Sequence, residues 1–326
     1  MIVDKFNRVH DYLRISLTDM CNLRCFYCMP DENYDFTPVS RLMQADEIYS
    51  IAKIFVDNGV KKIRLTGGEP FVRKDAAEII KSLSSLPIKL AVTSNGTRLH
   101  EFENILEASQ MHSINISLDT LKAEKFKLIT RRDQFTIVKQ NIETFINKGF
   151  HVKVNVVVMK DFNDDEILDF IKWSKTIPVH TRFIEFMPFA GNRWTSNKVV
   201  SMDEILQTIG KEYDFILVKG DKNDTEKKFQ ISGHAGSFAI ISTMTKPFCD
   251  SCNRMRLTAD GKLKNCLFSK GETDLLTPFR KGENILPLII ENIEGKAKEL
   301  GGQFTSNLAS VEAQLIDNRS MITIGG

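Results

Sequence analysis

The chain has no excess of charge of either sign and no long apolar run. It contains 44 basic and 42 acidic residues among 326, a net charge of +2, so it lacks the basic field of a nucleic-acid-binding protein. The opening residues, MIVDKFNRVHDY, lack the apolar core of a signal peptide, and no segment is apolar enough to span a membrane. We expect a cytoplasmic protein that binds neither nucleic acid nor membrane and holds any anionic ligand through local groups.

Cysteine is scarce, and the six cysteines form two triplets: Cys21, Cys25 and Cys28 in CNLRCFYC, then Cys249, Cys252 and Cys266 in the pattern CxxC-x13-C. A cytoplasmic location argues against disulfides. Each triplet is one ligand short of a closed tetrahedral zinc site, and no histidine lies at ligand spacing to complete it. Zinc remains the weaker alternative. Two iron–sulfur clusters, each with an open iron, are favoured.

The alternation of patterns predicts an α/β fold. β-branched runs at residues 13–18, 62–66, 89–93, 114–119, 151–159 and 182–187 alternate with helical periods at 45–58, 75–83, 99–108, 135–148 and 164–175. Serial βα units imply a parallel, right-handed sheet. Beyond about residue 194 we expect a helix at 202–209, a polar surface loop at 219–228, strands at 228–232, 237–244 and 255–263, and a helix at 283–300.

These elements divide into two predicted domains. Residues 1–194 form an open six-stranded (β/α)6 partial TIM barrel that carries the first triplet. Residues 195–326 form a smaller C-terminal α+β layer that carries the second triplet and closes the barrel mouth. A length of 326 residues is sufficient for one large α/β unit and a smaller one.

One face of the predicted strands is polar. Strands covered by helices on both faces normally read as unbroken apolar runs, whereas here Arg14, Arg64, Asn115, Ser117 and Lys153 alternate with aliphatic residues. If the apolar side meets the helices, the polar side points into the barrel, which is then wet or filled by a ligand. A half-exposed sheet with a solvated face is the alternative, and the βα spacing argues against it.

The ends of the first two strands carry the motifs nearest to chemistry, because βα barrels bind ligands at the carboxyl ends of their strands. The first triplet follows the first strand, and the second strand ends in TGGEP at residues 66–70. Its glycines permit a close backbone approach, and Glu69 can accept a hydrogen bond from an ammonium group. Alone, GGEP is more often a turn, but after a cysteine triplet it indicates a site.

These residues resemble a known family, the radical S-adenosylmethionine (SAM) enzymes. Their CxxxCxxC motif, with an aromatic residue before the last cysteine, is matched by Cys21, Cys25, Tyr27 and Cys28. The second triplet, the flanking CNRMRLTADGKLKNCLF, the RFIEFM segment and the final Gly325-Gly326 resemble the GTP 3′,8-cyclases of molybdenum cofactor biosynthesis over nearly the whole chain.

The resemblance implies a reaction. The first triplet would hold a [4Fe–4S] cluster whose open iron binds SAM, and reductive cleavage of SAM would give a 5′-deoxyadenosyl radical that takes the C3′ hydrogen of GTP. Bond formation between C3′ and C8 would give (8S)-3′,8-cyclo-7,8-dihydroguanosine 5′-triphosphate. The second triplet would hold an auxiliary [4Fe–4S] cluster that binds the purine. A flavodoxin- or ferredoxin-type electron donor, a downstream cyclic pyranopterin monophosphate synthase and a monomer or homodimer are also implied.

The resemblance also implies site residues, none of them catalytic beyond the cluster ligands. SAM would contact Tyr27, Gly68, Glu69, Ser117 and Met187, and GTP would contact Arg14, Lys62, Arg64, Thr93, Lys153, Arg182, Arg254, Met255 and Arg256. A triphosphate brings about four negative charges, which suits inward-facing Arg and Lys. Gly325 and Gly326 would reach into the active site, although chain ends are usually disordered.

Two other functions remain open at this point. One is a different radical SAM enzyme with an auxiliary cluster, such as a peptide modifier, which would usually bring more C-terminal cysteines. The other is a non-catalytic iron–sulfur or zinc protein, which would leave the polar barrel interior unexplained. No role is assigned to Arg131 or Arg132.

Overall fold

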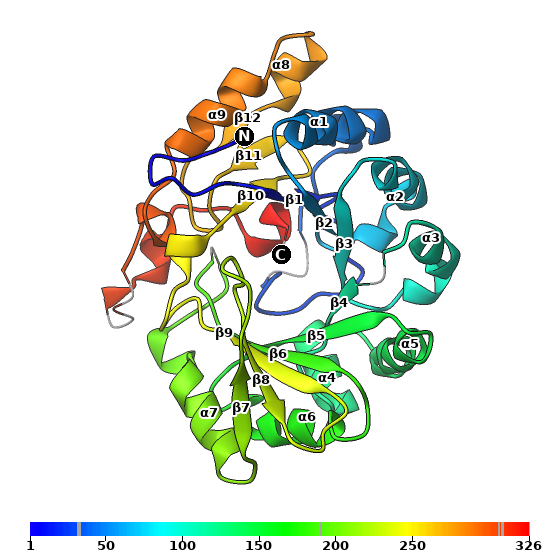
Figure 1. Cartoon of the computed structure of the whole chain (residues 1–326), viewed down its shortest axis with the longest axis vertical. Coiled ribbons are helices and arrows are strands. Elements are labelled where there is room, and N and C mark those ends of the chain that lie inside the picture. Colours follow the sequence, from blue (N-terminus) through cyan, green and yellow to red (C-terminus); the bar gives the residue numbers. More distant parts are fainter. Residues whose placement is uncertain (31–33, 112, 190, 306, 308–309, 326) are drawn as a thin grey trace.

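The computed structural model describes residues 1–30, 34–111, 113–189, 191–305, 307 and 310–325. Within them, one sheet of twelve strands runs in the order β12-β11-β10-β1-β2-β3-β4-β5-β6-β9-β8-β7. Figure 1 shows this sheet curving around the centre of the molecule, with α1 to α7 on its outside and the C-terminal end of the chain in the middle.

The first half alternates strands and helices as predicted. The strands are β1 (Tyr12–Ser16), β2 (Lys62–Thr66), β3 (Lys89–Ser94), β4 (Ser113–Ser117), β5 (His151–Val158) and β6 (His180–Glu185). The helices are α1 (Ala45–Asp57), α2 (Ala76–Ser84), α3 (Glu103–Ala108), α4 (Ala123–Thr130), α5 (Phe135–Asn147) and α6 (Ile167–Trp173). The sequence analysis did not predict α4.

The second half contains more strands than predicted. It comprises α7 (Met202–Gly210), β7 (Phe215–Val218), β8 (Lys227–Ile231), β9 (Ser237–Ile241), β10 (Arg254–Leu257), β11 (Lys262–Lys264), β12 (Thr273–Asp274), α8 (Leu276–Arg280), α9 (Leu286–Glu294) and α10 (Met321–Ile324). Short 3-10 helices are η1 (Val39–Arg41), η2 (Pro70–Val72), η3 (Leu99–Glu101), η4 (Asp164–Glu166), η5 (Ser196–Lys198), η6 (Cys249–Ser251), η7 (Leu300–Gly302) and η9 (Ala313–Leu315).

The prediction of one strand over 255–263 is wrong. β10 and β11 are antiparallel partners with Leu257 opposite Leu263, and the turn between them passes through Gly261, whose φ of +71° favours glycine. The Thr258 side chain accepts from the Lys262 backbone N–H at 2.9 Å. The turn chemistry of this segment outweighs its strand pattern.

The C-terminal strands differ from the predicted separate layer. β10 pairs in parallel with β1, and β9 pairs in parallel with β6, so the parallel sheet continues by one strand on each side of the predicted six. The physical reason is that an open edge strand leaves backbone N–H and C=O groups unpaired. The second half of the chain supplies partners to both edges.

The apolar face of the strands meets the helices, as predicted. Leu13 and Ile15 of β1 and Ile63 of β2 are fully buried, and α1 turns Ile51 and Phe55 into the same core. Burial of such side chains is worth about 1.5–3 kcal/mol each relative to exposure. The opposite, polar face is thereby directed into the barrel. Among the described residues, no helix is long and apolar enough to cross a membrane.

Candidate active site

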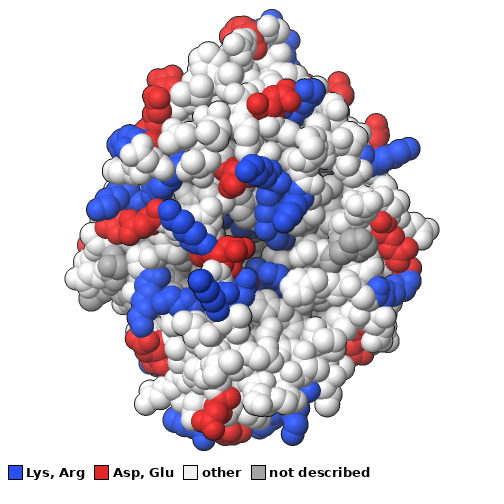
Figure 2. All heavy atoms as spheres, in the orientation of Figure 1, with Lys and Arg blue, Asp and Glu red and all other residues white. Residues whose placement is uncertain are grey.

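A cavity of about 650 Å³ lies inside the barrel. Its walls combine the polar strand faces with one cysteine triplet, and the predicted residues that line it are Arg14, Lys62, Arg64, Thr93, Lys153, Arg182, Met187, Arg254, Arg256, Cys249, Cys252 and Cys266. Figure 2 shows Lys and Arg gathered near the middle of the face seen in Figure 1, with acidic atoms among them. The residues predicted from strand parity and from the resemblance therefore form part of the cavity wall.

Met255 is an exception among the predicted GTP contacts. Its side chain is fully buried in the apolar core and does not line the cavity. The reason is that successive residues of a strand face opposite sides of the sheet. Because Arg254 and Arg256 face the cavity, the residue between them faces the helices.

Three arginines form a row across adjacent strands. Arg14 is in register with Arg256 on one side and with Arg64 on the other. Burial and the charge of Arg256 hold the pKa of Arg14 well below its usual value, and burial and Arg254 lower the pKa of Arg256 to about 10. Concentrated like charges of this kind are relieved by a bound anion. The row therefore suits a polyphosphate.

The second cysteine triplet opens into the same cavity. Cys252 Sγ lies 3.6 Å from Arg254 Nη2 and 3.5 Å from the Nζ of the buried Lys296. Burial would raise the pKa of Cys252, but Arg254 and Lys296 lower it to about 6. The Leu300 backbone N–H donates to Cys249 Sγ at 3.4 Å. Thiolate ligands supported by N–H donors fit an iron–sulfur cluster.

The first triplet lies in the loop after β1, as predicted. Burial raises the pKa of Cys25, and the neighbouring Cys21, Asp119 and Cys28 raise it further. Burial also raises the pKa of Cys21 to about 11 and of Cys28 to about 12. Such thiols bind as thiolates when a cation stabilises them, and soft sulfur ligands suit iron–sulfur clusters. Within the described residues, no three His, Cys, Asp or Glu side chains are placed to hold a single metal ion.

The double glycine after β2 packs against the loop that carries the first triplet. Gly68 N donates to Thr18 O at 2.7 Å, and a Cβ on Gly68 would lie 2.4 Å from Met20 O. Gly67 has a φ of +146°. The glycines therefore allow the backbones of these two loops to approach each other closely, because any side chain here would push the loops apart.

Glu69 ties the second and third strand loops together. It is fully buried and accepts from Phe71 N at 3.1 Å, Ser94 Oγ at 2.9 Å and Asn95 N at 2.6 Å. Asn95 in turn donates through Nδ2 to Cys21 Sγ at 3.7 Å. Burial raises the pKa of Glu69 to about 7. Its contact with an ammonium group of SAM stays a prediction, and its structural role is the link between these loops.

The other predicted SAM contacts fall in two places. Tyr27 and Ser117 line a small cavity of about 30 Å³ beside Cys25, where Tyr27 Oη donates to Asp119 Oδ2 at 2.6 Å. Met187 lines the large cavity instead. Neither Gly68 nor Glu69 lines either cavity. The small cavity has room for one or two waters, so only the large one could hold a nucleoside.

The C-terminal tail reaches the polar face of the barrel. The Arg256 Nη1 group donates to Gly325 O at 2.5 Å, and a Cβ on Gly325 would lie 2.7 Å from Thr66 Oγ1 and 2.8 Å from the Cβ of Ser16. Gly325 thus lies against Ser16, Thr66 and Arg256, and its part in the reaction stays a prediction. Gly326 lies outside the described residues.

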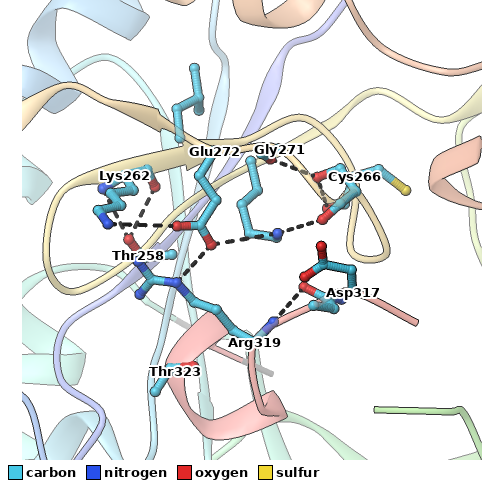
Figure 3. Close-up of polar contacts among 12 residues, drawn as sticks. Thr258, Lys262, Cys266, Gly271, Glu272, Asp317, Arg319 and Thr323 are labelled. Carbon is cyan, nitrogen blue, oxygen red and sulfur yellow. Dashed lines mark hydrogen bonds and ion pairs between the residues drawn. The ribbon is translucent and has the colours of Figure 1, made fainter. Parts of the chain in front are cut away.

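Arg319 anchors this tail (Figure 3). Its Nε lies 2.7 Å from Glu272 Oε1, and its Nη2 lies 2.9 Å from Asp260 Oδ2. The fully buried Lys264 also pairs with Glu272 Oε1, at 3.6 Å. The ion pairs hold the start of α10 beside the β10–β11 hairpin. No sequence signal pointed to Arg319.

Sequence reasoning missed several cavity residues. Asn115 and Asn155 line the cavity; strand parity directed them into the barrel, but neither was predicted to contact a ligand. Tyr12 also lines it and accepts from Arg64 Nε at 2.6 Å. Glu226 lines it too, although it belongs to the segment predicted to be a surface loop, and no pattern indicated its inward position.

Comparison with known proteins agrees with this geometry. Residues 15–174 match the radical SAM superfamily, and residues 179–301 match the molybdenum cofactor synthesis C family. The crystal structure of Streptococcus suis SuiB shares the fold with a TM-score of 0.65 and 15% identity, covering 90% of this chain and 69% of that one. At that identity the likeness concerns the fold alone.

Curated relatives are much closer in sequence. The mitochondrial GTP 3′,8-cyclase of Arabidopsis thaliana is 44% identical over 100% of this chain and 84% of its own length. The GTP 3′,8-cyclase of Listeria welshimeri is 40% identical over 91% of both chains. Human molybdenum cofactor biosynthesis protein 1 is 41% identical over 99% of this chain, which spans 51% of that longer protein.

The fold and the cysteine-bearing loop together define a radical SAM enzyme, a class that uses SAM and a [4Fe–4S] cluster. Within that class, the identities with the plant and Listeria relatives show that the chain belongs to the family of the GTP 3′,8-cyclases.

Proposed function

We propose that this protein catalyses the first step of molybdenum cofactor biosynthesis, the conversion of GTP to (8S)-3′,8-cyclo-7,8-dihydroguanosine 5′-triphosphate. The observation that carries the proposal is one cavity of about 650 Å³ that holds a row of arginines on one wall and a cysteine triplet on another. A purine at the triplet and a triphosphate at the arginines would occupy adjoining parts of such a cavity, because the charges of Cys252 and Cys266 act on Arg256. The family and its curated relatives support the same reaction.

We assign the first triplet to a cluster that supplies, when bound with SAM and reduced, the radical that starts the reaction. Cys21, Cys25 and Cys28 would hold that cluster, and all three are half-buried and form no disulfide. Tyr27, Gly68, Glu69, Ser117 and Met187 remain the predicted SAM contacts. Glu69 would act through the loops that it links as well as through any direct contact.

The second triplet would hold an auxiliary [4Fe–4S] cluster at the purine end. Arg14, Arg64 and Arg256 would bind the triphosphate, with support from Lys62, Thr93, Lys153, Arg182 and Arg254. These side chains orient the nucleotide so that its ribose faces the interior, and the walls around them exclude bulk water. Gly325 would contribute its carbonyl to holding Arg256 in place.

The competing functions are less well supported. A non-catalytic zinc or iron–sulfur protein has no use for the arginine row. A peptide-modifying radical SAM enzyme has no use for a closely spaced set of cations suited to a polyphosphate, and the Arabidopsis and Listeria relatives, at 44% and 40% identity, are named as cyclases.

Several wider predictions accompany this function. The division of the chain at 194/195 is predicted from the change in the helix and strand pattern. The resemblance implies a flavodoxin- or ferredoxin-type donor, transfer of the product to a cyclic pyranopterin monophosphate synthase, and a monomeric or homodimeric state. A cytoplasmic location is the prediction from the opening residues, and the Arabidopsis relative is named as mitochondrial.

The test is an anaerobic assay after reconstitution with iron and sulfide. SAM, GTP and dithionite are added, and 5′-deoxyadenosine formation and loss of GTP are followed together. We expect Cys25→Ser to abolish both, and Cys266→Ser to abolish GTP conversion while SAM cleavage persists. Wild-type protein that cleaves SAM and leaves GTP intact would retain the radical SAM class and overturn the substrate.

A further inference from the structure

A carboxylate lines the same cavity as the arginine row. Glu226 is only 8% exposed, and its Oε1 lies 3.3 Å from Lys153 Nζ and 3.4 Å from His180 Nε2. Its Oε2 lies 3.2 Å from Arg182 Nη1, and Lys228 Nζ is 3.7 Å from Oε1. One buried anion thus faces four basic side chains.

The cations around Glu226 differ from those on the other wall. Arg64 donates to Tyr12 Oη and the Val92 carbonyl, and Arg256 donates to the Gly325 carbonyl, which are neutral acceptors. Lys153 and Arg182, by contrast, face a carboxylate. Burial would raise the pKa of Glu226, but His180, Arg182 and Lys153 hold it far below its usual range, so this carboxylate is ionised.

The segment that carries Glu226 has few ties to the core. It links β7 to β8 at the outer edge of the sheet, and β7 exposes Ile216 and Leu217 at 69% and 65%. Residues 221–223 are exposed although they border the cavity mouth. Asp224 pairs with Lys228 at 2.8 Å within the same hairpin. An outward movement of 221–226 would therefore leave the barrel core unchanged.

We propose that Glu226 holds the position of a substrate phosphate in the free enzyme and leaves it when the nucleotide binds. The identity of the nucleotide rests on the proposed function. The displacement of Glu226 itself requires only that a polyphosphate binds to Lys153 and Arg182. A triphosphate offers Lys153 and Arg182 more charge than one carboxylate does, so the exchange favours the ligand. Before the nucleotide binds, Glu226 neutralises Lys153 and Arg182, which would otherwise repel each other and Lys228.

The consequence is competition between an internal and an external anion. The apparent affinity for a polyphosphate is reduced by the fraction of protein in which Glu226 occupies the site. An amide of the same size removes that competition and keeps the packing. The internal carboxylate would also reject nucleotides with fewer phosphates, because these cannot replace its charge.

The decisive experiment compares Glu226→Gln with wild type by calorimetry, with GTP and, separately, inorganic tripolyphosphate as ligands. We expect the variant to bind both about tenfold more tightly or better, with guanosine unchanged. Glu166→Gln is the matched control, because the buried Glu166 pairs with Lys125 at 2.8 Å outside the cavity. Equal or weaker binding by Glu226→Gln would mean that Glu226 orients the cations for the ligand, and the proposal would fail.

A second measurement on wild-type protein does not depend on the stability of the variant. Amide hydrogen exchange of residues 219–226 is expected to rise on adding tripolyphosphate, while β5 and β6 stay protected. Unchanged or slower exchange in that segment would overturn the displacement. Tighter tripolyphosphate binding by the variant in a protein that never converts GTP would support the role of Glu226 and refute the cyclase function, so the two failures are distinguishable.

Discussion

Arg14 of β1 and Arg256 of β10 lie side by side in a parallel ladder, although they come from opposite ends of the chain. Arg256 is 7% exposed and Arg14 is half-buried in the cavity wall, and the charge of Arg256 lowers the pKa of Arg14. A site that concentrates like charges gives up folding stability for anion binding. The arrangement therefore predicts a large response to a bound polyphosphate.

Replacing Arg14 by methionine should weaken that response. The aliphatic part is kept and one cation is lost, which should cost about 1.5–3 kcal/mol of GTP binding, as for hydrogen bonds to charged groups. The measurement is the rise in melting temperature on adding GTP, which we expect to shrink. Lys53→Met is the control, since Lys53 pairs with Asp57 at the surface. An undiminished thermal shift would remove Arg14 from the binding site.

Cysteine labelling in the cluster-free protein should depend on pH in a site-specific way. The thiolate is the reactive form, and the pKa of Cys252 is lowered to about 6 while those of Cys21 and Cys28 are raised to about 11 and 12. As pH rises through 6, Cys252 loses its proton and iodoacetamide labelling should increase, whereas Cys21 and Cys28 stay thiols at pH 7. Mass spectrometry of the labelled peptides checks this. One common pH profile would contradict it.

Lys296 should raise the reduction potential of a cluster at the second triplet. Its buried ammonium lies 3.5 Å from Cys252 Sγ, and a reduced cluster carries one more negative charge. In Lys296→Met, losing about 1.4 kcal/mol of preference for the reduced form would lower a one-electron potential by about 59 mV. A spectroscopic redox titration measures it, with the exposed Lys298→Met as control. An unchanged potential would leave Lys296 a structural role only.

Gly325→Ala should release the tail. The φ of Gly325 is +82° and an added Cβ would lie 2.7 Å from Thr66 Oγ1, so the substitution combines about 1–2 kcal/mol of backbone strain with a clash. Hydrogen exchange of residues 321–325 should rise and GTP conversion should fall, with the melting temperature nearly constant. Gly282→Ala is the matched control, because its φ is +76° and nothing lies within 4 Å of the new Cβ. A protected tail in Gly325→Ala would contradict the docking.

Local patterns predicted much of the fold. The bounds of β2 match the predicted 62–66. Its lysine and arginine side chains alternate with aliphatic ones, and in a sheet with one polar face such a segment can pair in only one register. The hairpin at Gly261 and the exposed β7 were missed. At Gly261, a turn interrupts a continuous strand-like pattern. In β7, four successive apolar residues show no alternation, so the sequence does not indicate which side of the strand is buried.

The candidate site divides in the same way. Strand parity placed Arg14, Arg64 and Lys153 in the cavity because the pleat alternates faces whatever the partner strand is. The same rule, applied to Met255, would have removed it from the predicted contacts. Parity says nothing about loops, so the inward position of Glu226 and the anchoring of the tail by Arg319 could not be predicted.

The amino-acid sequence by itself determined the series of strands and helices, the polar face of the barrel and the two cysteine triplets, because each depends on spacings of a few residues. Only the tertiary structure decided that β9 and β10 extend the sheet at its two edges, that Arg256 stands beside Arg14 and that Glu226 faces Lys153. Those contacts join residues far apart in the chain, and their formation depends on strand register and on which buried charges can be paired, which no local pattern encodes.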